Sequence, residues 1–201
     1  LGYPVKLEFT SIFPPEGGNL RPLSDIIGEK KNFQQWIGIA PFAAHEGKIL
    51  PTEKTEELIK EISRRHPSCR IFLFGGGEKE HAVLNAWCER YNNCTNASQA
   101  LHSLKEEMVV MSHLDVMVSM DSGNMHLAAI SGTRVISVWG ETHPYAGFLG
   151  WNQRPEDCIQ VELPCRPCSI YGNKPCQRGD YACLTFIDPI TIADKVDWIL
   201  N

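Results

Sequence analysis

The sequence has no long hydrophobic run and no excess of basic charge. Its apolar stretches fall short of the roughly 18 residues that a membrane-spanning helix needs, and we recognise no secretory leader. The net charge is −5 at neutral pH, so no basic field favours nucleic acid. We therefore expect no transmembrane segment and no nucleic-acid partner. The expected location is the cytoplasm, with peripheral contact at the inner face of the membrane as an option.

Two common phosphate-binding motifs are also missing. The chain contains no G-x-x-x-x-G-K-[ST] loop, and Gly75–Gly77 does not form a G-x-G-x-x-G fingerprint. These absences argue against a P-loop enzyme and against an NAD-binding fold.

The composition is that of an ordinary folded domain. The chain has 201 residues, of which 43% are hydrophobic and 21% charged, enough for one domain or one and a half with a real core. It begins at Leu1 rather than at Met. We therefore expect it to be an excised piece of a longer protein.

Apolar strand patterns alternate with helical patterns after Trp36. The expected strands are 37–40, 70–74, 115–119, 134–139 and 158–163, and the expected helices are 52–65, a segment from the GGG turn to about 90, 103–112, 122–131 and 189–200. Such alternation predicts right-handed βαβ units. The predicted fold class is α/β, a Rossmann-like open parallel sheet with helices on both faces.

Polar and glycine-rich turns follow four of these strands. They contain Lys48, Gly75–Glu78, Asp121–Asn124 and Gly140–Thr142. Ligands of open α/β sheets bind outside the carboxyl ends of the strands, where helix N-termini and a lysine suit phosphate oxygens. Each motif alone also has a purely structural interpretation. Gly75–Gly77 could be a tight turn, Asp121 and Ser122 a helix N-cap, His126 a surface or core histidine, and Lys48 a solvated side chain. Their convergence at one edge favours a nucleotide or pyrophosphate site.

The segment DSGNMHLAAISGTRVISVWGETHP, residues 121–144, resembles the signature of glycosyltransferase family 9, the lipopolysaccharide heptosyltransferases and their relatives. That pattern reads D-[ST]-G-x-x-H-L-x-A-A, then a strand, then [FYW]-G-x-T-x-P. The similarity extends upstream to IGIAPFAAHEGKILP and FGGGEKE and downstream into a cysteine-rich segment. It covers roughly residues 36–200.

The resemblance implies the GT-B architecture of two Rossmann-like halves, of which this chain is similar to the C-terminal half only. Residues 1–35 would be the end of the N-terminal half and the interdomain linker. Residues 36–201 would form the donor-binding domain, including the cysteine-rich segment 165–183. The half that binds the acceptor, a glycolipid or another glycan, and carries the catalytic base would be missing, so we expect this piece to be inactive alone.

The resemblance also implies roles for single residues. Lys48 would contact the diphosphate, Glu78 would accept hydrogen bonds from ribose hydroxyls, and Asp121 would contact sugar hydroxyls. His126 would support the leaving diphosphate or the sugar, and Asp121 and His126 are the only residues for which we expect a supporting part in catalysis. The full set of implied donor-binding residues is Lys48, Gly76, Gly77, Glu78, His102, Asp121, Ser122, Gly123, His126 and Thr142.

The implied reaction is an inverting transfer of a sugar from a nucleoside diphosphate, with an ADP-sugar favoured. The chain has no D-x-D motif, so we expect no catalytic metal and no cofactor for the reaction. His102 stands where close relatives can carry a methionine beside adenine, and Glu141 stands where a proline is common. Both departures leave the base and the sugar open.

Eight cysteines are present, and four of them have the spacing C-x2-C-x7-C-x6-C: Cys165, Cys168, Cys176 and Cys183. A C-x2-C pair followed by two thiols can close a tetrahedral structural zinc site, although two disulfides or four free thiols fit as well. Three cations lie in or beside this segment, and they could face acidic groups of a glycolipid acceptor or simply be solvated: Arg166, Lys174 and Arg178.

Two other functions stay open at this point. The first is another sugar-nucleotide enzyme of the same architecture, such as an epimerase, whose sheet-edge loops should differ from D-S-G-x-x-H. The second is a non-catalytic interaction module held together by zinc. The acidic composition and the four convergent loops argue against the interaction module.

Overall fold

The computed structural model describes residues 8–32 and 35–201. The strands are β1 Trp36–Ala40, β2 Arg70–Leu73, β3 Cys94–Asn96, β4 Val116–Met120, β5 Val135–Val138 and β6 Cys158–Ile159. The helices are α1 Ser24–Ile27, α2 Thr52–Arg65, α3 Glu78–Arg90, α4 Ala97–Ala100, α5 Leu104–Met111, α6 Gly123–Ile130, α7 Ala182–Thr185 and α8 Pro189–Leu200. Short 3-10 turns lie at Arg21–Leu23, Lys30–Asn32, Glu46–Lys48, Pro144–Ala146 and Pro155–Asp157.

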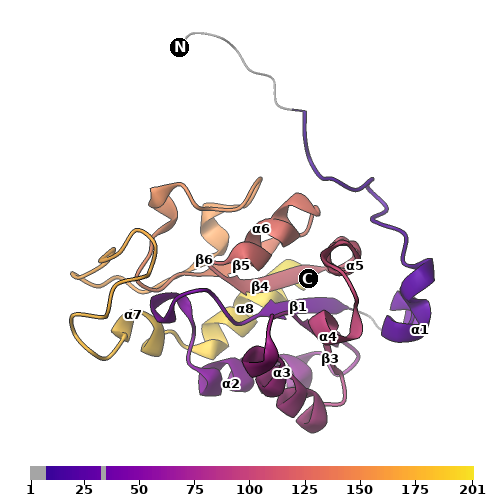
Figure 1. Ribbon diagram of the computed structural model, residues 1–201, viewed down its shortest axis with the longest axis horizontal. Helices are drawn as coiled ribbons and strands as arrows, with labels where there is room; N and C mark the ends of the chain where they lie inside the picture. Colours follow the sequence, from indigo (N-terminus) through magenta and orange to yellow (C-terminus); the bar gives the residue numbers. More distant parts are fainter. Residues whose placement is uncertain (1–7, 33–34) are drawn as a thin grey trace.

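The six strands form one sheet in the order β3-β2-β1-β4-β5-β6, and all neighbouring strands are parallel (Figure 1). This arrangement confirms the predicted Rossmann-like α/β class. The sequence analysis did not predict β3. It also expected a strand over 158–163, of which only Cys158–Ile159 pairs with β5.

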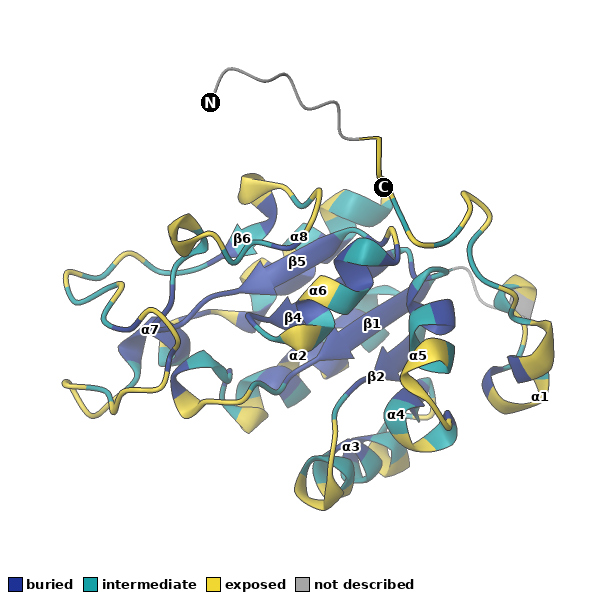
Figure 2. Cartoon of the chain, turned by 45° about the horizontal axis from the view of Figure 1, so that its top comes forward, coloured by how far each residue is buried: buried dark blue, intermediate teal, exposed yellow. Residues whose placement is uncertain are grey.

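Helices cover both faces of the sheet, so its central strands β1, β4 and β5 are buried throughout (Figure 2). Ile37 and Ile39 pack toward α2, α3 and α8, whereas Trp36 and Ala40 of the same strand pack toward α4, α5 and α6. This alternation follows from the two-residue period of a strand. It explains why the strand sequences read as continuous apolar runs rather than as apolar and polar residues in turn.

Residues 8–32 lie against α5 and α6 on one side of the sheet. The amide of Ile12 donates to the carbonyl of Ile130 at 2.9 Å, and Leu23 and Ile27 join the apolar core on that side. Lys30 forms a 2.7 Å ion pair with Asp115 at the start of β4. The division into 1–35 and 36–201 stays a prediction.

No helix of the described part of the chain is long and apolar enough to cross a membrane.

Candidate functional site

The strand order reverses between β1 and β4, which are neighbours in the middle of the sheet. The chains leaving these two strands diverge to opposite sides, and a crevice opens at their carboxyl ends. The loop after β1 brings Lys48 to this crevice, and Asp121 follows β4 directly. Lys48 Nζ lies 3.0 Å from Asp121 Oδ2. The predicted convergence of these two loops is therefore present.

Asp121 connects three loops. It is buried, with 3% of its surface exposed, and its Oδ2 accepts a 2.8 Å hydrogen bond from Thr142 Oγ1 in the loop after β5. The same oxygen faces Lys48 from the loop after β1. Asp121 does not cap helix α6, since Ser122 is the N-cap residue. Its role as a pairing partner for Lys48 and Thr142 replaces the simpler reading as a helix cap.

The N-terminus of α6 faces open space. Ser122 has extended backbone angles, and its side chain accepts no hydrogen bond from the first turn. A Cβ placed on the exposed Gly123 would meet no atom within 4 Å. Unpaired N–H groups and the positive end of the helix dipole favour an anion at such a position. This end of α6 can therefore receive phosphate oxygens without any rearrangement of its capping residue.

A cavity of about 230 Å³ lies in front of this helix end. Five of the predicted donor-binding residues line it: Lys48, Asp121, Ser122, Gly123 and His126. Ala44, Phe148, Ile170 and Tyr171 complete the lining. The sequence analysis did not anticipate the last three, which supply an apolar wall opposite the polar one.

The remaining predicted residues lie elsewhere. Thr142 does not line this cavity but donates to Asp121, which does. Gly76, Gly77, Glu78 and His102 do not line it either, and all four are exposed around the loop after β2 and the turn before α5. The amide of Gly76 donates to Glu80 Oε2 at 2.7 Å. Glu80, rather than Glu78, therefore organises this loop. Its position four residues after Gly76, within the helix that the loop begins, is the signal that could have identified it.

Glu141 is the most unusual side chain near the site. Its surface is fully buried, and neither carboxylate oxygen has a hydrogen-bond partner among the described residues. Burial, and secondarily the charge of Glu46, raises the pKa of this carboxyl. In contrast to the side chain, both backbone polar groups of Glu141 are hydrogen-bonded. Its amide donates to the Gly47 carbonyl at 2.9 Å, and its carbonyl accepts from the Cys168 amide at 3.2 Å.

Arg166 anchors the cysteine-rich segment to the sheet. Its guanidinium donates to the carbonyls of Gly140 and Val161, and to that of Thr142 at 3.0 Å. The side chain is half-buried, and burial lowers its pKa. The guanidinium of Arg166 therefore has a structural role, held by backbone carbonyls, that neither reading from sequence included. Contact of this arginine with an acceptor stays a prediction. Arg178 pairs with Asp180 at the surface, at 2.9 Å.

The four clustered cysteines carry free thiols, as do the other four in the chain. Within residues 8–32 and 35–201, no three His, Cys, Asp or Glu side chains gather so as to hold a metal ion. Burial raises the pKa of the Cys168 thiol, and raises that of Cys183 to about 11. The zinc site stays a prediction.

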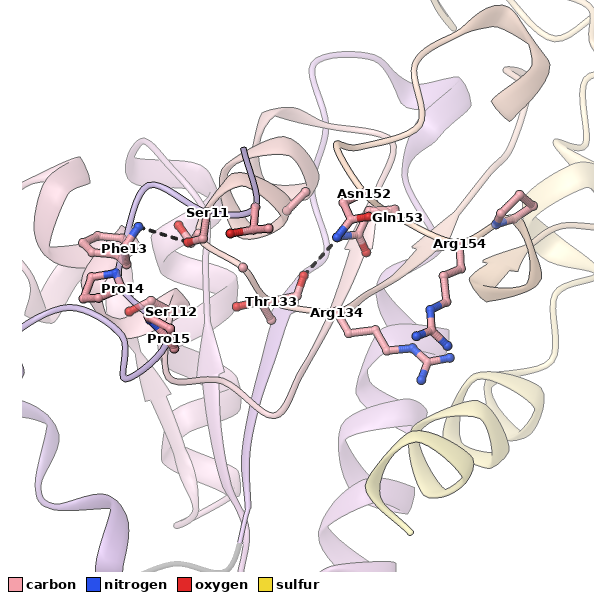
Figure 3. Close-up of a pocket in the computed structure, with 15 residues that line it drawn as sticks. Ser11, Phe13, Pro14, Pro15, Ser112, Thr133, Arg134, Asn152, Gln153 and Arg154 are labelled. Carbon is pink, nitrogen blue, oxygen red and sulfur yellow. Dashed lines mark hydrogen bonds between the residues drawn. The ribbon is translucent and has the colours of Figure 1, made fainter. Parts of the chain in front are cut away.

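A larger cavity, of about 550 Å³, lies at the opposite edge of the sheet (Figure 3). Thr10, Ser11 and Phe13–Pro15 form one side of it, and Thr133–Arg134 and Asn152–Pro155 form another. Arg134 is held there by Asp157, at 2.7 Å. None of the predicted donor-binding residues lines this cavity. It lies at the amino ends of the strands, whereas the predicted ligand edge is the carboxyl one.

With this geometry in view, the chain can be compared with known proteins. The model of glycosyltransferase family 9 (heptosyltransferase) matches residues 23–177. The chain belongs to glycosyltransferase family 9. This finding confirms the resemblance that the segment 121–144 indicated, and it makes an unrelated interaction module untenable.

Relatives in the family are longer than this chain. Lipooligosaccharide heptosyltransferase 2 of Campylobacter jejuni serotype O:2 is 21% identical over 178 residues, which are 85% of this chain and 53% of that protein. Lipopolysaccharide heptosyltransferase 1 of Campylobacter coli is 31% identical over 127 residues, 61% of this chain and 35% of that protein. The chain thus spans about half the length of these family 9 proteins or less.

Solved structures of family 9 share the fold. The ADP-heptose lipopolysaccharide heptosyltransferase II of E. coli superposes with a TM-score of 0.68 at 19% identity, covering 90% of this chain and 50% of that one. A family 9 glycosyltransferase from Veillonella parvula gives a TM-score of 0.65 at 15% identity, covering 90% and 49%. The likeness to about half of each structure agrees with the expected half of a GT-B protein.

Proposed function

We propose that this chain is the donor-binding half of a heptosyltransferase-like glycosyltransferase of lipopolysaccharide or surface-glycan synthesis. Its ligand is a nucleoside diphosphate sugar, with an ADP-sugar favoured because related structures contain ADP or an ADP-linked heptose. The observation that carries this proposal is the meeting of Lys48, Asp121 and the N-terminus of α6 around one cavity.

The electrostatics of this cavity favour a diphosphate. The charges of Lys48 and Asp121 largely cancel while they are paired at 3.0 Å. Before a ligand binds, the positive potential in the cavity therefore comes from the N-terminus of α6. An arriving diphosphate competes with Asp121 for Lys48. Once Lys48 turns to the phosphates, the Asp121 carboxylate can accept hydrogen bonds from sugar hydroxyls, while Thr142 holds it in place. Donor binding therefore exchanges one ion pair for another.

The proposed reaction is an inverting transfer without metal or cofactor. An acceptor hydroxyl, delivered by the N-terminal half of the full protein, attacks the anomeric carbon as the diphosphate leaves. Its proton passes to the catalytic base expected in that half. Negative charge accumulates on the leaving group, so Lys48 and the amides of Ser122 and Gly123 stabilise the transition state more than the ground state. His126 lines the same cavity and supports the departing phosphate or the sugar.

The nucleoside is proposed to extend toward the loop after β2. Gly76 and Gly77 are exposed and leave room beside their backbone, and Glu78 would accept the ribose hydroxyls, with His102 beside the base. We further propose that the protein acts at the cytoplasmic face of a membrane, where its acceptor lies. Structural zinc at the four clustered cysteines would be tested by metal analysis of the purified chain.

The test is a thermal-shift panel with ADP, UDP, GDP and CMP on the wild-type chain, Lys48→Ala and Lys60→Ala. Lys60 is an exposed lysine of α2 and serves as the matched control. A ligand at 100 times its Kd stabilises a protein by about 2.7 kcal/mol. We expect one diphosphate, ADP, to raise the melting temperature of the wild type and Lys60→Ala but not of Lys48→Ala. Equal shifts in all three proteins, or none in the wild type, would contradict the proposal.

A further inference from the structure

The cavity in front of α6 has two chemically different walls. Lys48, Asp121, Ser122, Gly123 and His126 form the polar wall, and Phe148, Ile170 and Tyr171 form the apolar one. A diphosphate is satisfied by the polar wall alone. A sugar has a rim of hydroxyls and faces of C–H groups, so it is recognised by carboxylates and aromatic rings together. The second wall therefore points to a ligand that continues beyond the phosphates.

The direction of that continuation follows from the positions of the loops. The residues assigned to the nucleoside lie around the loop after β2, outside this cavity. The aromatic wall comes from other segments, the loop after β5 and the cysteine-rich segment. Since a nucleotide sugar carries its sugar and its nucleoside on opposite ends of the diphosphate, the aromatic wall lies at the sugar end.

Tyr171 is exposed, yet its backbone is held firmly. Sixty per cent of its surface is accessible. On one side, the Gly172 amide donates to Ser169 Oγ at 2.8 Å, and the amide of Cys168 donates to the Glu141 carbonyl. A turn fixed in this way presents Tyr171 in one place at little further entropic cost.

The other side of the turn rests on Lys48. Gly172 has a φ of +70°, and a Cβ at this position would overlap Cγ and Cδ of Lys48. The turn that carries Tyr171 is thus packed directly on the stem of the lysine assigned to the diphosphate. The contact between Gly172 and the stem of Lys48 therefore fixes the aromatic Tyr171 relative to the lysine assigned to the diphosphate.

Phe148 supports the tyrosine ring. The two ring centroids lie 5.9 Å apart, with the planes tilted by 44°, within the range in which aromatic pairs attract. Phe148 is partly buried against the core beside α6. The ring of Tyr171 is thus supported from one side by Phe148, while most of its surface stays free to contact a ligand.

We propose that Tyr171, backed by Phe148, is the wall on which the sugar of the nucleotide donor packs, and that it makes the chain prefer a sugar-linked diphosphate to the free diphosphate. This inference rests on the proposed function. Neither residue belongs to the segment 121–144, so the site extends into the cysteine-rich segment.

The test compares the Kd of ADP and of ADP-heptose by titration calorimetry for the wild type, Tyr171→Ala, Tyr171→Phe and Tyr145→Ala. Tyr145 is an exposed aromatic residue of a neighbouring loop that does not line the cavity. We expect Tyr171→Ala to weaken ADP-heptose about tenfold and to leave ADP unchanged. Tyr171→Phe and Tyr145→Ala should behave as the wild type does.

The outcomes separate this inference from the proposed function. If ADP binds and depends on Lys48, but Tyr171→Ala weakens both ligands equally or neither, the sugar wall is wrong and the donor site stands. If neither ligand binds the wild type, both proposals fail. A loss of ADP-heptose affinity in Tyr145→Ala that equals the loss in Tyr171→Ala would also overturn the assignment.

Discussion

Two buried carboxylates lie at the carboxyl ends of the neighbouring strands β4 and β5, and their surroundings are opposite. Asp121 is paired with Lys48 and hydrogen-bonded by Thr142. Glu141 is buried even more completely, yet its two oxygens have no partner in the part of the chain that the structure describes. Burial alone therefore does not make a functional carboxylate. The partners decide whether its charge is held in place for a ligand or is a cost to the fold.

The two carboxylates should therefore affect the free energy of unfolding in opposite ways. Removing one member of a buried pair leaves an uncompensated charge, whereas neutralising an unpaired carboxylate removes a cost. Substitutions around Asp121 should therefore destabilise the fold, and a neutral replacement of Glu141 should not.

The largest effect is expected for Lys48→Met. The stems of the two side chains are similar, but Asp121 loses its cation while it stays 4% exposed. We expect a loss of about 3 kcal/mol in the free energy of unfolding, measured in urea at pH 7. Asp121→Asn in the same background should recover part of that loss. If the double variant is no more stable than Lys48→Met, the pair does not carry the stability that we assign to it.

A smaller loss, about 1.5 kcal/mol, is expected for Thr142→Val, because a hydrogen bond to a charged acceptor disappears while the shape is kept. Thr55→Val is the matched control. Thr55 is also buried, but its hydroxyl has no partner among the described residues, so its replacement should be neutral or stabilising. Equal denaturation midpoints for the two variants would show that the bond from Thr142 to Asp121 contributes nothing.

The smallest effect is expected for Glu141→Gln, and it should depend on pH. Because burial raises the pKa of Glu141 in the folded chain, folding favours the protonated form, and the wild type loses stability as the pH rises through that pKa. The glutamine variant carries no such cost. Its melting temperature should therefore match the wild type most closely near pH 4 and exceed it at higher pH, where the wild-type carboxyl is ionised. Parallel curves across this range would refute a raised pKa.

Regular elements with strong patterns could be predicted from sequence. The helix over 52–65 is α2 Thr52–Arg65, and the helix over 189–200 is α8 Pro189–Leu200. The strand β3 was missed because its three residues, Cys94–Asn96, carry no run of apolar or β-branched side chains. Hydrogen bonds from a neighbouring strand, not local preference, define it. The segment 160–163, in contrast, has the local pattern of a strand without being one. Val161 and Leu163 alternate with polar residues and pack on the core, but the segment does not pair with β5.

The polar half of the site could also be predicted, because the sheet rule brings the loops after β1 and β4 together. Its apolar half could not. Tyr171 lies between cysteines that drew attention to metal binding. Its position depends on a local hydrogen bond from Gly172 to Ser169 and on one from Cys168 to Glu141, in a loop far away in the sequence. Glu141 was noted in the sequence only as a departure from the family pattern, and nothing local predicted its burial, in which its side chain packs against Gly47.

The two outermost strands, β3 with three residues and β6 with two, are the shortest of the sheet. A short edge exposes few unpaired amides and carbonyls to which a strand of another molecule could add. The longer and mostly apolar strands, which would aggregate most readily, are all interior. Because both edge strands are short, association of two molecules through their sheet edges is disfavoured. We therefore expect the chain to stay unaggregated at the high protein concentrations that calorimetry requires.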